Sequence, residues 1–299
     1  MCTLLAAQST AGPVLGSNSD NPYLVGSRVL ASTEGALPFI GTEVTTYRAA
    51  EAVPWNSVMT RGLNAHGVAF TYSYVPASKS ESNGYRKLVD RRGTRDALGQ
   101  AASAEEFVSL LQQRASRLND GNYLIADSKG VVVVTINGQR STRRTIEPGQ
   151  NIACTNSWFA GQEPDDDAWV GESFSKERLG QAAVVQSTPL LEVQDVRQAL
   201  HSALAQNDDQ EDANSQEART VDAHGKDSGT ISSEIIVPAE GTLWWCYGWP
   251  SGTSRGYESF IRDSWGEYLP FQVSKVDHTG LLTTEDGTIT LYGTKVLAA

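Results

Sequence analysis

Apolar residues at the start of the chain predict a hairpin of two strands. Residues 2–8 form an apolar run that is typical of a buried strand, and Gly12-Pro13 has the composition of a turn. A partner strand then begins at Val14 and leads into a polar cluster at residues 17–22. We expect this cluster at a strand end, where its side chains are presented rather than buried.

Alternating polar and apolar positions predict three further strands, at residues 28–32, 43–47 and 57–61. Residues 62–67 contain Asn and Gly, which tolerate positive φ, so we expect a tight turn there and a strand at residues 68–75. The polar residues 78–90 indicate a surface loop. Strands are also expected at residues 122–127, 131–137, 152–155, 229–237, 242–248 and 288–291.

Helical spacing of apolar residues replaces this alternation in two parts of the chain. Ser103-Ala104-Glu105-Glu106 has the pattern of a capping box, in which Ser and Glu satisfy backbone N–H groups at the start of a helix. Two more helices are predicted at residues 176–185 and 193–205. Residues 207–228 are rich in Asp, Glu, Gln and Asn, and they predict a long, polar, mobile loop.

The order of these elements indicates the fold class. Strands come first, helices follow, and strands resume near the end, without regular alternation of strand and helix. Such an order favours a layered α+β fold with largely antiparallel sheets. No change of composition marks a second domain, so we expect one domain over residues 2–299.

Composition and charge narrow the class of protein. Of 299 residues, 39% are hydrophobic and 20% are charged, which is typical of a globular chain. The net charge of −11, from 24 basic and 35 acidic residues, disfavours nucleic acid and anionic membranes as partners. No apolar run approaches the roughly 20 residues of a membrane span. Because a signal-peptide pattern is also missing, we expect a cytoplasmic protein.

The sequence contains no motif that indicates a nucleotide-binding or metal-binding site. The chain has no P-loop, and no GxGxxG between a strand and a helix. Asp165-Asp166-Asp167 lacks the glycine and the spaced ligands of a calcium loop, and His201 and His224 have no partners at ligand spacing. Solvated surface is the better account of these residues. We therefore expect neither a metal nor a cofactor.

Cys2 offers a different chemistry, because removal of Met1 would place a thiol and a free α-amine on one residue. An α-amine titrates near pH ~7.7–8.0 and can take the proton of the thiol. A small buried hydrophobe that opens a strand is the alternative interpretation of this cysteine. Asp20 would lie beside the amine after the hairpin, and Asn156 offers an amide donor for an oxyanion without adding charge.

Several short motifs occur together in one order: Met1-Cys2-Thr3, Gly16-Ser17-Asn18-Ser19-Asp20, Gly62-Leu63-Asn64-Ala65-His66-Gly67-Val68, Thr155-Asn156 and Ser175-Lys176-Glu177-Arg178. In this order the chain resembles the cysteine N-terminal-nucleophile (Ntn) hydrolases, which include penicillin V acylases, bile salt hydrolases, isopenicillin N acyltransferase-like enzymes and secernins. The similarity spans most of the chain except residues 207–228.

The resemblance implies a four-layer αββα sandwich of two mainly antiparallel sheets between helical layers. It implies Cys2 as the nucleophile with its own amine as the base, Asp20 as the partner of the amine, and Asn156 as an oxyanion donor. Arg178 falls where related acyltransferases have an arginine near the site. We also expect Asn18, Tyr72, Tyr74 and Trp158 to bind the substrate.

Two departures from the family pattern concern the site. Bile salt hydrolases have an arginine at the position of Ser17, so the cation that tunes their thiol is missing from this position. They also have a second asparagine on the strand after the turn, where this chain has Thr71-Tyr72-Ser73-Tyr74. The second oxyanion donor is then expected to be a backbone N–H of that strand.

We expect an amide hydrolase or acyltransferase that forms an acyl-thioester on Cys2. Its substrate would be a small N-acylated amine or an amino-acid-derived amide, and hydrolysis and transfer share every named residue. The acidic residues 163–167 and the net charge suit a cationic amine as acceptor. The alternative is a catalytically silent protein that keeps the fold for binding. A homo-oligomer is compatible with both interpretations.

Overall fold

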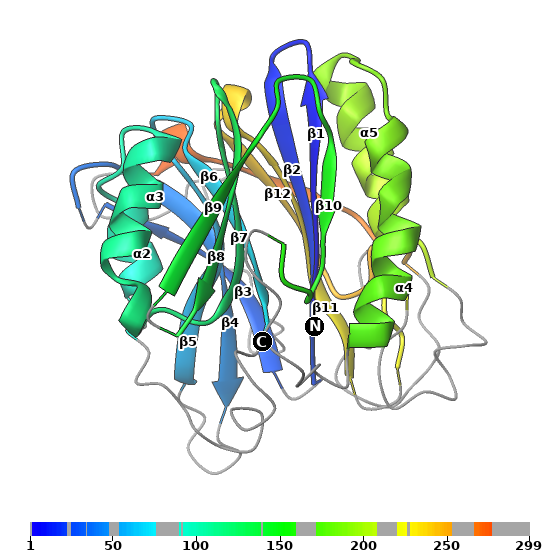
Figure 1. Cartoon of the computed structure of the whole chain (residues 1–299), viewed down its shortest axis with the longest axis horizontal. Coiled ribbons are helices and arrows are strands. Elements are labelled where there is room, and N and C mark those ends of the chain that lie inside the picture. Colours follow the sequence, from blue (N-terminus) through cyan, green and yellow to red (C-terminus); the bar gives the residue numbers. More distant parts are fainter. Residues whose placement is uncertain are drawn as a thin grey trace.

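Two antiparallel sheets between helices make up the fold, and the computed structural model shows them face to face (Figure 1). Helices α2 (Gly93–Leu98) and α3 (Ala104–Gln113) cover the outer face of one sheet. Helices α4 (Glu172–Ala182) and α5 (Val193–Leu204) cover the other. The α+β class and the αββα layers are therefore confirmed. The structure describes residues 2–22, 25–33, 35–47, 54–75, 90, 92–138, 140–159, 172–207, 220–225, 228–252 and 266–276.

The six-stranded sheet carries both the N-terminal strand and the later strands of the chain. Its order is β10 (Ile152–Cys154), β1 (Cys2–Ser9), β2 (Gly12–Pro22), β11 (Ser228–Val237), β12 (Thr242–Tyr247) and β13 (Leu269–Gln272). Because β1 lies between β2 and β10, two segments far apart in the sequence flank the first residues of the chain.

The seven-stranded sheet follows the sequence as a meander, in which each strand pairs with the next. Its strands are β3 (Val25–Ser32), β4 (Phe39–Tyr47), β5 (Pro54–Asn64), β6 (Ala69–Tyr74), β7 (Gly121–Asp127), β8 (Gly130–Asn137) and β9 (Arg140–Ile146). The described residues also include the short 3-10 helices η1 (Ala115–Arg117), η2 (Ala183–Ser187), η3 (Pro238–Glu240) and η4 (Val273–Lys275).

Strand periodicity divides the apolar residues among three layers of core. Leu4 and Leu15 of the six-stranded sheet meet Leu63 of the other sheet in the central layer. Their neighbours Leu5 and Val14 point outward and pack with α5. The outer layer of the seven-stranded sheet includes residues of α2 and α3. Residues at odd and even positions of one strand thus face different parts of the molecule.

The predicted hairpin is confirmed, but its turn and its polar end differ from the expectation. The turn is Thr10-Ala11, because β2 already begins at Gly12. The polar residues 17–20 are buried rather than presented, and none is more than 2% exposed. Strand β2 lies inside its sheet, with the facing sheet on one side and helices on the other. Their polar atoms are therefore satisfied within the protein.

The turn expected at residues 62–67 is shorter than predicted. Strand β5 continues to Asn64, and the chain reverses at Ala65 and His66. Gly67 follows with a φ of +74°, the left-handed region that favours glycine. The Asn64 side chain accepts hydrogen bonds from the backbone of His66 and Val68, which fixes this turn.

Part of the predicted polar loop lies in the core. Residues 220–225 are buried, and Asp222 and His224 are 0% and 1% exposed. His224 stacks on Trp249 at 3.7 Å between ring centroids and lies 3.2 Å from Asp222, so its expected place on a solvated surface is wrong. Backbone hydrogen bonds hold this segment in place: Asp222 N donates to the carbonyl of Gln206, and Thr230 N of β11 donates to the carbonyl of Ala223.

The helices are confirmed with small shifts in their ends. Ser103 caps α3 by accepting the N–H of Glu106, as the capping-box pattern predicts. The helix expected at residues 176–185 begins earlier, and its last residues form η2. No helix in the part of the chain that the structure describes is long and apolar enough to cross a membrane. The strand expected at residues 288–291, the acidic residues 163–167 and most of the loop at 78–90 lie outside the described residues.

Candidate active site

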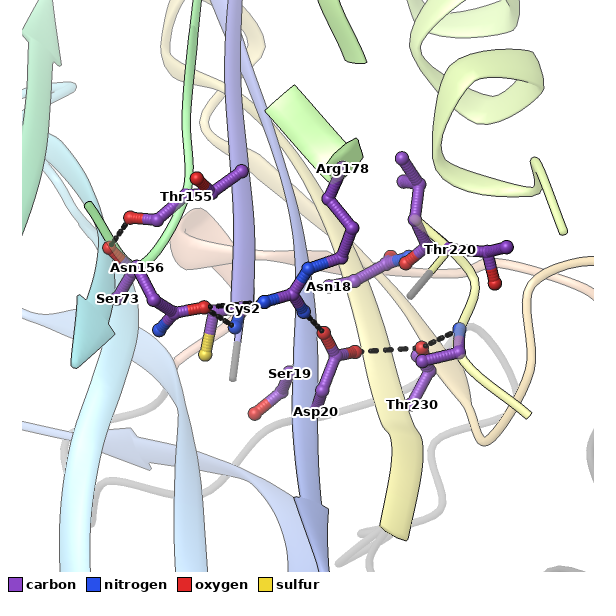
Figure 2. A network of polar contacts seen from close by, with 12 residues as sticks. Cys2, Asn18, Ser19, Asp20, Ser73, Thr155, Asn156, Arg178, Thr220 and Thr230 are labelled. Atoms are coloured by element: carbon purple, nitrogen blue, oxygen red, sulfur yellow. Dashed lines mark hydrogen bonds and ion pairs between the residues drawn. The ribbon is translucent and has the colours of Figure 1, made fainter. Parts of the chain in front are cut away.

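Three segments converge on the N-terminal end of β1. Cys2 pairs with Ser19 of β2, and on the other side Leu4 lies opposite Cys154 of β10. The chain leaving β10 therefore runs beside Cys2, and the Cys2 nitrogen donates to Asn156 Oδ1 at 2.7 Å (Figure 2). Sheet pairing thus brings together two residues that are 154 positions apart.

Arg178 of α4 connects Asn156 with Asp20 (Figure 2). Its Nη2 donates to Asn156 Oδ1 at 3.0 Å, and its Nη1 donates to Asp20 Oδ2 at 2.7 Å. The second carboxylate oxygen of Asp20 accepts the hydroxyl of Thr230 at 2.8 Å. A chain of contacts consequently runs from the Cys2 nitrogen through Asn156 and Arg178 to the Asp20 carboxylate. These are the four residues that the family resemblance selects for catalysis.

Burial controls the electrostatics of this chain of contacts. Asp20 and Arg178 are 2% and 0% exposed. Desolvation raises the pKa of the Asp20 carboxyl, while the Arg178 guanidinium and the Thr230 hydroxyl oppose the shift. A buried ion pair needs good geometry and further hydrogen bonds to offset its desolvation. Both carboxylate oxygens of Asp20 and both terminal nitrogens of Arg178 have partners, whereas Arg178 Nε has none among the described residues.

The orientation of the Asn156 amide is fixed by its contacts. Oδ1 accepts from the Cys2 nitrogen and from Arg178, while Nδ2 donates to the carbonyl of Tyr74 in the facing sheet. An amide nitrogen carries two hydrogens, so Nδ2 can also donate to a second acceptor. The carbonyl of the preceding Thr155 accepts from Ser73 and Asn122, which hold this segment in place.

Arg61 of β5 lies near Cys2, and it was not among the residues expected from the sequence. Its guanidinium crosses from the seven-stranded sheet, and Nη2 donates to the carbonyl of Asn18, which lies opposite Thr3 in the pairing of β1 with β2. It also donates to Ser17 Oγ at 3.1 Å and pairs with Glu234 at 3.2 Å. Arg61 and Glu234 are 1% and 0% exposed. The sequence does carry a signal for Arg61, which is a charged residue in a strand whose neighbouring positions are apolar. Arginine is rarely buried without a partner, so an arginine in such a strand indicates a buried ion pair.

The structure separates the residues that were expected to bind substrate. Asn18 points to the helix layer, where its Nδ2 donates to the carbonyls of Leu204 and Val221. Tyr72 lies in the outer core and donates to the carbonyl of Asp120. Asn18 shares its face of β2 with Asp20, and the Asn18 Nδ2 and the Tyr72 hydroxyl are both occupied by backbone carbonyls. Contact of Asn18 or Tyr72 with a substrate stays a prediction.

Two of the expected substrate-binding residues lie near the site. Tyr74 contacts Asn156 through its carbonyl and is 45% exposed. Trp158 follows Asn156 by two positions and is half-buried. Contact of either side chain with a substrate stays a prediction.

The other cysteines have a different chemistry from the one proposed for Cys2. Burial raises the pKa of the Cys154 thiol, and it raises the pKa of Cys246 to about 12. Both residues therefore stay protonated near neutral pH. The described residues contain no group of three or more His, Cys, Asp or Glu side chains that could hold a metal ion.

Solved structures match the fold over nearly the whole chain. A mutant of the conjugated bile acid hydrolase from Clostridium perfringens, with its cysteine replaced by alanine, is 13% identical, with a TM-score of 0.56 over 98% of this chain and 96% of that chain. A second variant of the same hydrolase, with an arginine replaced by leucine, is also 13% identical, with a TM-score of 0.54 over 97% and 96%. Penicillin V acylase from Agrobacterium tumefaciens is 11% identical, with a TM-score of 0.49 over 83% of each chain.

Sequence comparisons give the family. A comparison with curated proteins finds no match. The family model for acyl-coenzyme A:6-aminopenicillanic acid acyl-transferase matches residues 8–251, which is most of the chain. The expected relationship to Ntn-type amidohydrolases and acyltransferases is thereby confirmed. The chain belongs to the acyl-coenzyme A:6-aminopenicillanic acid acyl-transferase family of enzymes.

Proposed function

We propose that the chain cleaves a small-molecule amide through an acyl-thioester on Cys2, after removal of Met1 has freed the amine. The observation that carries this proposal is the 2.7 Å contact between the Cys2 nitrogen and Asn156 Oδ1. Asn156 is itself held by Arg178, which is paired with Asp20. An N-terminal nucleophile needs its amine to be oriented, and this arrangement supports that role.

The α-amine acts as the general base in this mechanism. Once Met1 is removed, the hydrogen bond from this nitrogen to Asn156 Oδ1 would hold the free amine in place on the residue that also carries the thiol. The thiol proton passes to the amine, and sulfur attacks the amide carbon to form a tetrahedral intermediate. The protonated amine then gives its proton to the leaving nitrogen, the carbon–nitrogen bond breaks, and the acyl-thioester remains on Cys2.

Asn156 also stabilises the oxyanion that forms during attack. Its Nδ2 has a hydrogen to donate besides the one on the Tyr74 carbonyl. Removal of one donor from an oxyanion hole costs about 10²–10³ in kcat. A backbone N–H of residues 71–74 is the second donor that we propose, since this strand adjoins Asn156 through Tyr74.

The acyl group leaves Cys2 by transfer to water or to an amine. The family's name describes acyl transfer to 6-aminopenicillanic acid, and two matching structures are hydrolases of conjugated bile acids. We propose a small N-acylated amine as donor substrate for this chain. The net charge of −11 supports a cationic amine rather than an anionic one as the acceptor.

Intact-mass spectrometry with a nitrophenyl acyl ester tests the Cys2 intermediate. The native protein without Met1 should gain one acyl group, and Cys2→Ala should gain none. Cys154→Ala is the matched control, because it removes a buried thiol outside the site and should still be acylated. A native protein that lacks Met1 and stays unlabelled contradicts the proposal and favours a catalytically silent binding protein. Added amines then separate transfer from hydrolysis by the mass of the released product.

A further inference from the structure

Arg61 is a buried cation that faces the proposed nucleophile from the opposite sheet. It shares the inward-facing side of β5 with Leu63, which lies in the core between the sheets. Its Nη2 donates to the carbonyl of Asn18 at 3.0 Å, and Asn18 lies opposite Thr3, the residue after Cys2, in the pairing of β1 with β2. Cys2 shares the inward-facing side of β1 with Leu4, which lies in the core between the sheets. A fully buried arginine stays charged, so a permanent positive charge lies on the same inner side of the six-stranded sheet as the Cys2 side chain.

Glu234 and Ser17 hold this guanidinium in place. Ser17 lies opposite Glu234 in the pairing of β2 with β11. The Ser17 hydroxyl accepts from Arg61 Nε at 3.1 Å and donates to Glu234 Oε2 at 3.0 Å. The other oxygen of Glu234 accepts from Ser232 at 2.8 Å. Arg61 is thus held by the six-stranded sheet although it belongs to the seven-stranded one.

Ser17 has a short side chain, and its hydroxyl accepts from the guanidinium of Arg61, which arrives from the facing sheet. The positive charge of Arg61 is therefore held on the inner side of the six-stranded sheet, next to Ser17 and Asn18 of β2.

We propose that Arg61 is a catalytic residue that stabilises the Cys2 thiolate, and that Glu234 is the positioning residue that holds it. This inference rests on the proposed role of Cys2 as the nucleophile. Glu234 also competes with the thiolate for the positive charge of Arg61. Loss of Glu234 and loss of Arg61 should therefore move thiolate formation in opposite directions, which a purely structural ion pair would not do.

The test measures the rate of Cys2 alkylation by iodoacetamide against pH, with intact mass as the readout. Glu234→Gln should lower the pH of half-maximal alkylation rate, because the carboxylate is lost while Arg61 keeps its proton and its positive charge. In Arg61→Gln/Glu234→Gln this midpoint pH should lie at least about one unit above that of Glu234→Gln, which is the usual effect of removing a nearby charge. These two variants differ only at Arg61, and neither leaves a buried carboxylate without its cation.

Controls keep the outcome interpretable. Arg28→Gln removes an arginine that is paired with Glu43 on the same sheet and is 41% exposed, so its profile should match the native one. If the double glutamine variant does not fold, Arg61→Met/Glu234→Met replaces the pair by apolar residues, which buried sites often tolerate. The proposal is overturned if a folded variant without Arg61 has a midpoint pH of alkylation within about 0.3 pH units of that of Glu234→Gln. A nearby positive charge should shift this midpoint further.

Alkylation needs no amide substrate, which separates this inference from the proposed function. A shifted midpoint together with an absence of acyl-enzyme supports the role of Arg61 and contradicts amide cleavage. An unshifted midpoint in a protein that forms the acyl-enzyme overturns the role of Arg61 alone.

Discussion

At the scale of single residues, Asn156 combines two tasks in one amide group. Its oxygen accepts from the Cys2 nitrogen and from Arg178, and its nitrogen donates toward the facing sheet. Asparagine suits both tasks because it offers an acceptor and two donors without a charge. Aspartate keeps the acceptor and removes the donors, so one substitution separates the tasks.

We expect Asn156→Asp to lower kcat by about 10²–10³, the effect of losing one oxyanion donor, while Cys2 is still alkylated. Steady-state kinetics on an N-acyl amine and alkylation of the same preparation provide the two measurements. Asn156→Ala is the companion variant and should impair both, because it also removes the acceptor of the Cys2 nitrogen. Native kcat in Asn156→Asp would exclude the amide nitrogen as an oxyanion donor.

At the scale of elements, α4 contributes a buried charge to the site. Arg178 is 0% exposed and pairs with Asp20 of β2, so the helix and the strand are joined by an ion pair. Arg178→Gln should destabilise the fold by about 3–5 kcal/mol, because it leaves a buried carboxylate without its cation. Urea unfolding at pH 7 measures the loss in free energy of unfolding relative to the native protein. Arg178→Gln/Asp20→Asn should recover part of this lost stability, because it also removes the buried carboxylate.

The same variant should respond to pH. Burial already raises the pKa of Asp20, and loss of Arg178 removes the main influence that opposes this shift. The folded state then binds a proton that the unfolded state releases, so stability falls as pH rises above the unfolded pKa of about 3.9. Arg178→Gln should therefore be less destabilised at pH 5 than at pH 8. An equal loss at both pH values would contradict this account.

Elements with clear periodicity were predictable, and elements without it were not. The β1–β2 hairpin and α3 follow from apolar spacing and a capping residue. Strand β9 was missed because most of its side chains are exposed and three are arginines, which gives no apolar alternation. Helix α2 was missed because it has only six residues.

The candidate site residues came from short motifs rather than from strand periodicity. Cys2, Asp20, Asn156 and Arg178 come from such motifs and meet in the structure. Asn18 and Asp20 are two positions apart on β2 and share one face of the strand, so periodicity alone does not separate them. The partnership of Arg61 with Glu234 joins two sheets, so neither strand alone reveals it.

At the scale of the whole molecule, the site draws on three layers of the sandwich. The six-stranded sheet supplies Cys2 and Asp20, the facing sheet supplies Arg61, and the helix layer supplies Arg178. Packing of the layers therefore fixes the relative positions of Asp20, Arg61 and Arg178 around Cys2, the proposed nucleophile. Conditions that separate the layers should abolish the site before they melt the individual strands and helices.

Cys154 can report this loss of packing, because it lies in the core between the sheets. It is 1% exposed and burial raises its pKa, so iodoacetamide should reach it only through unfolding. In native buffer at pH 8 we expect peptide mapping to find label on Cys2 and none on Cys154. In urea, label on Cys154 should appear with the unfolding transition, and Cys2→Ala should leave that midpoint unchanged. Labelling of Cys154 in native buffer as fast as Cys2 would show that the layers open without global unfolding.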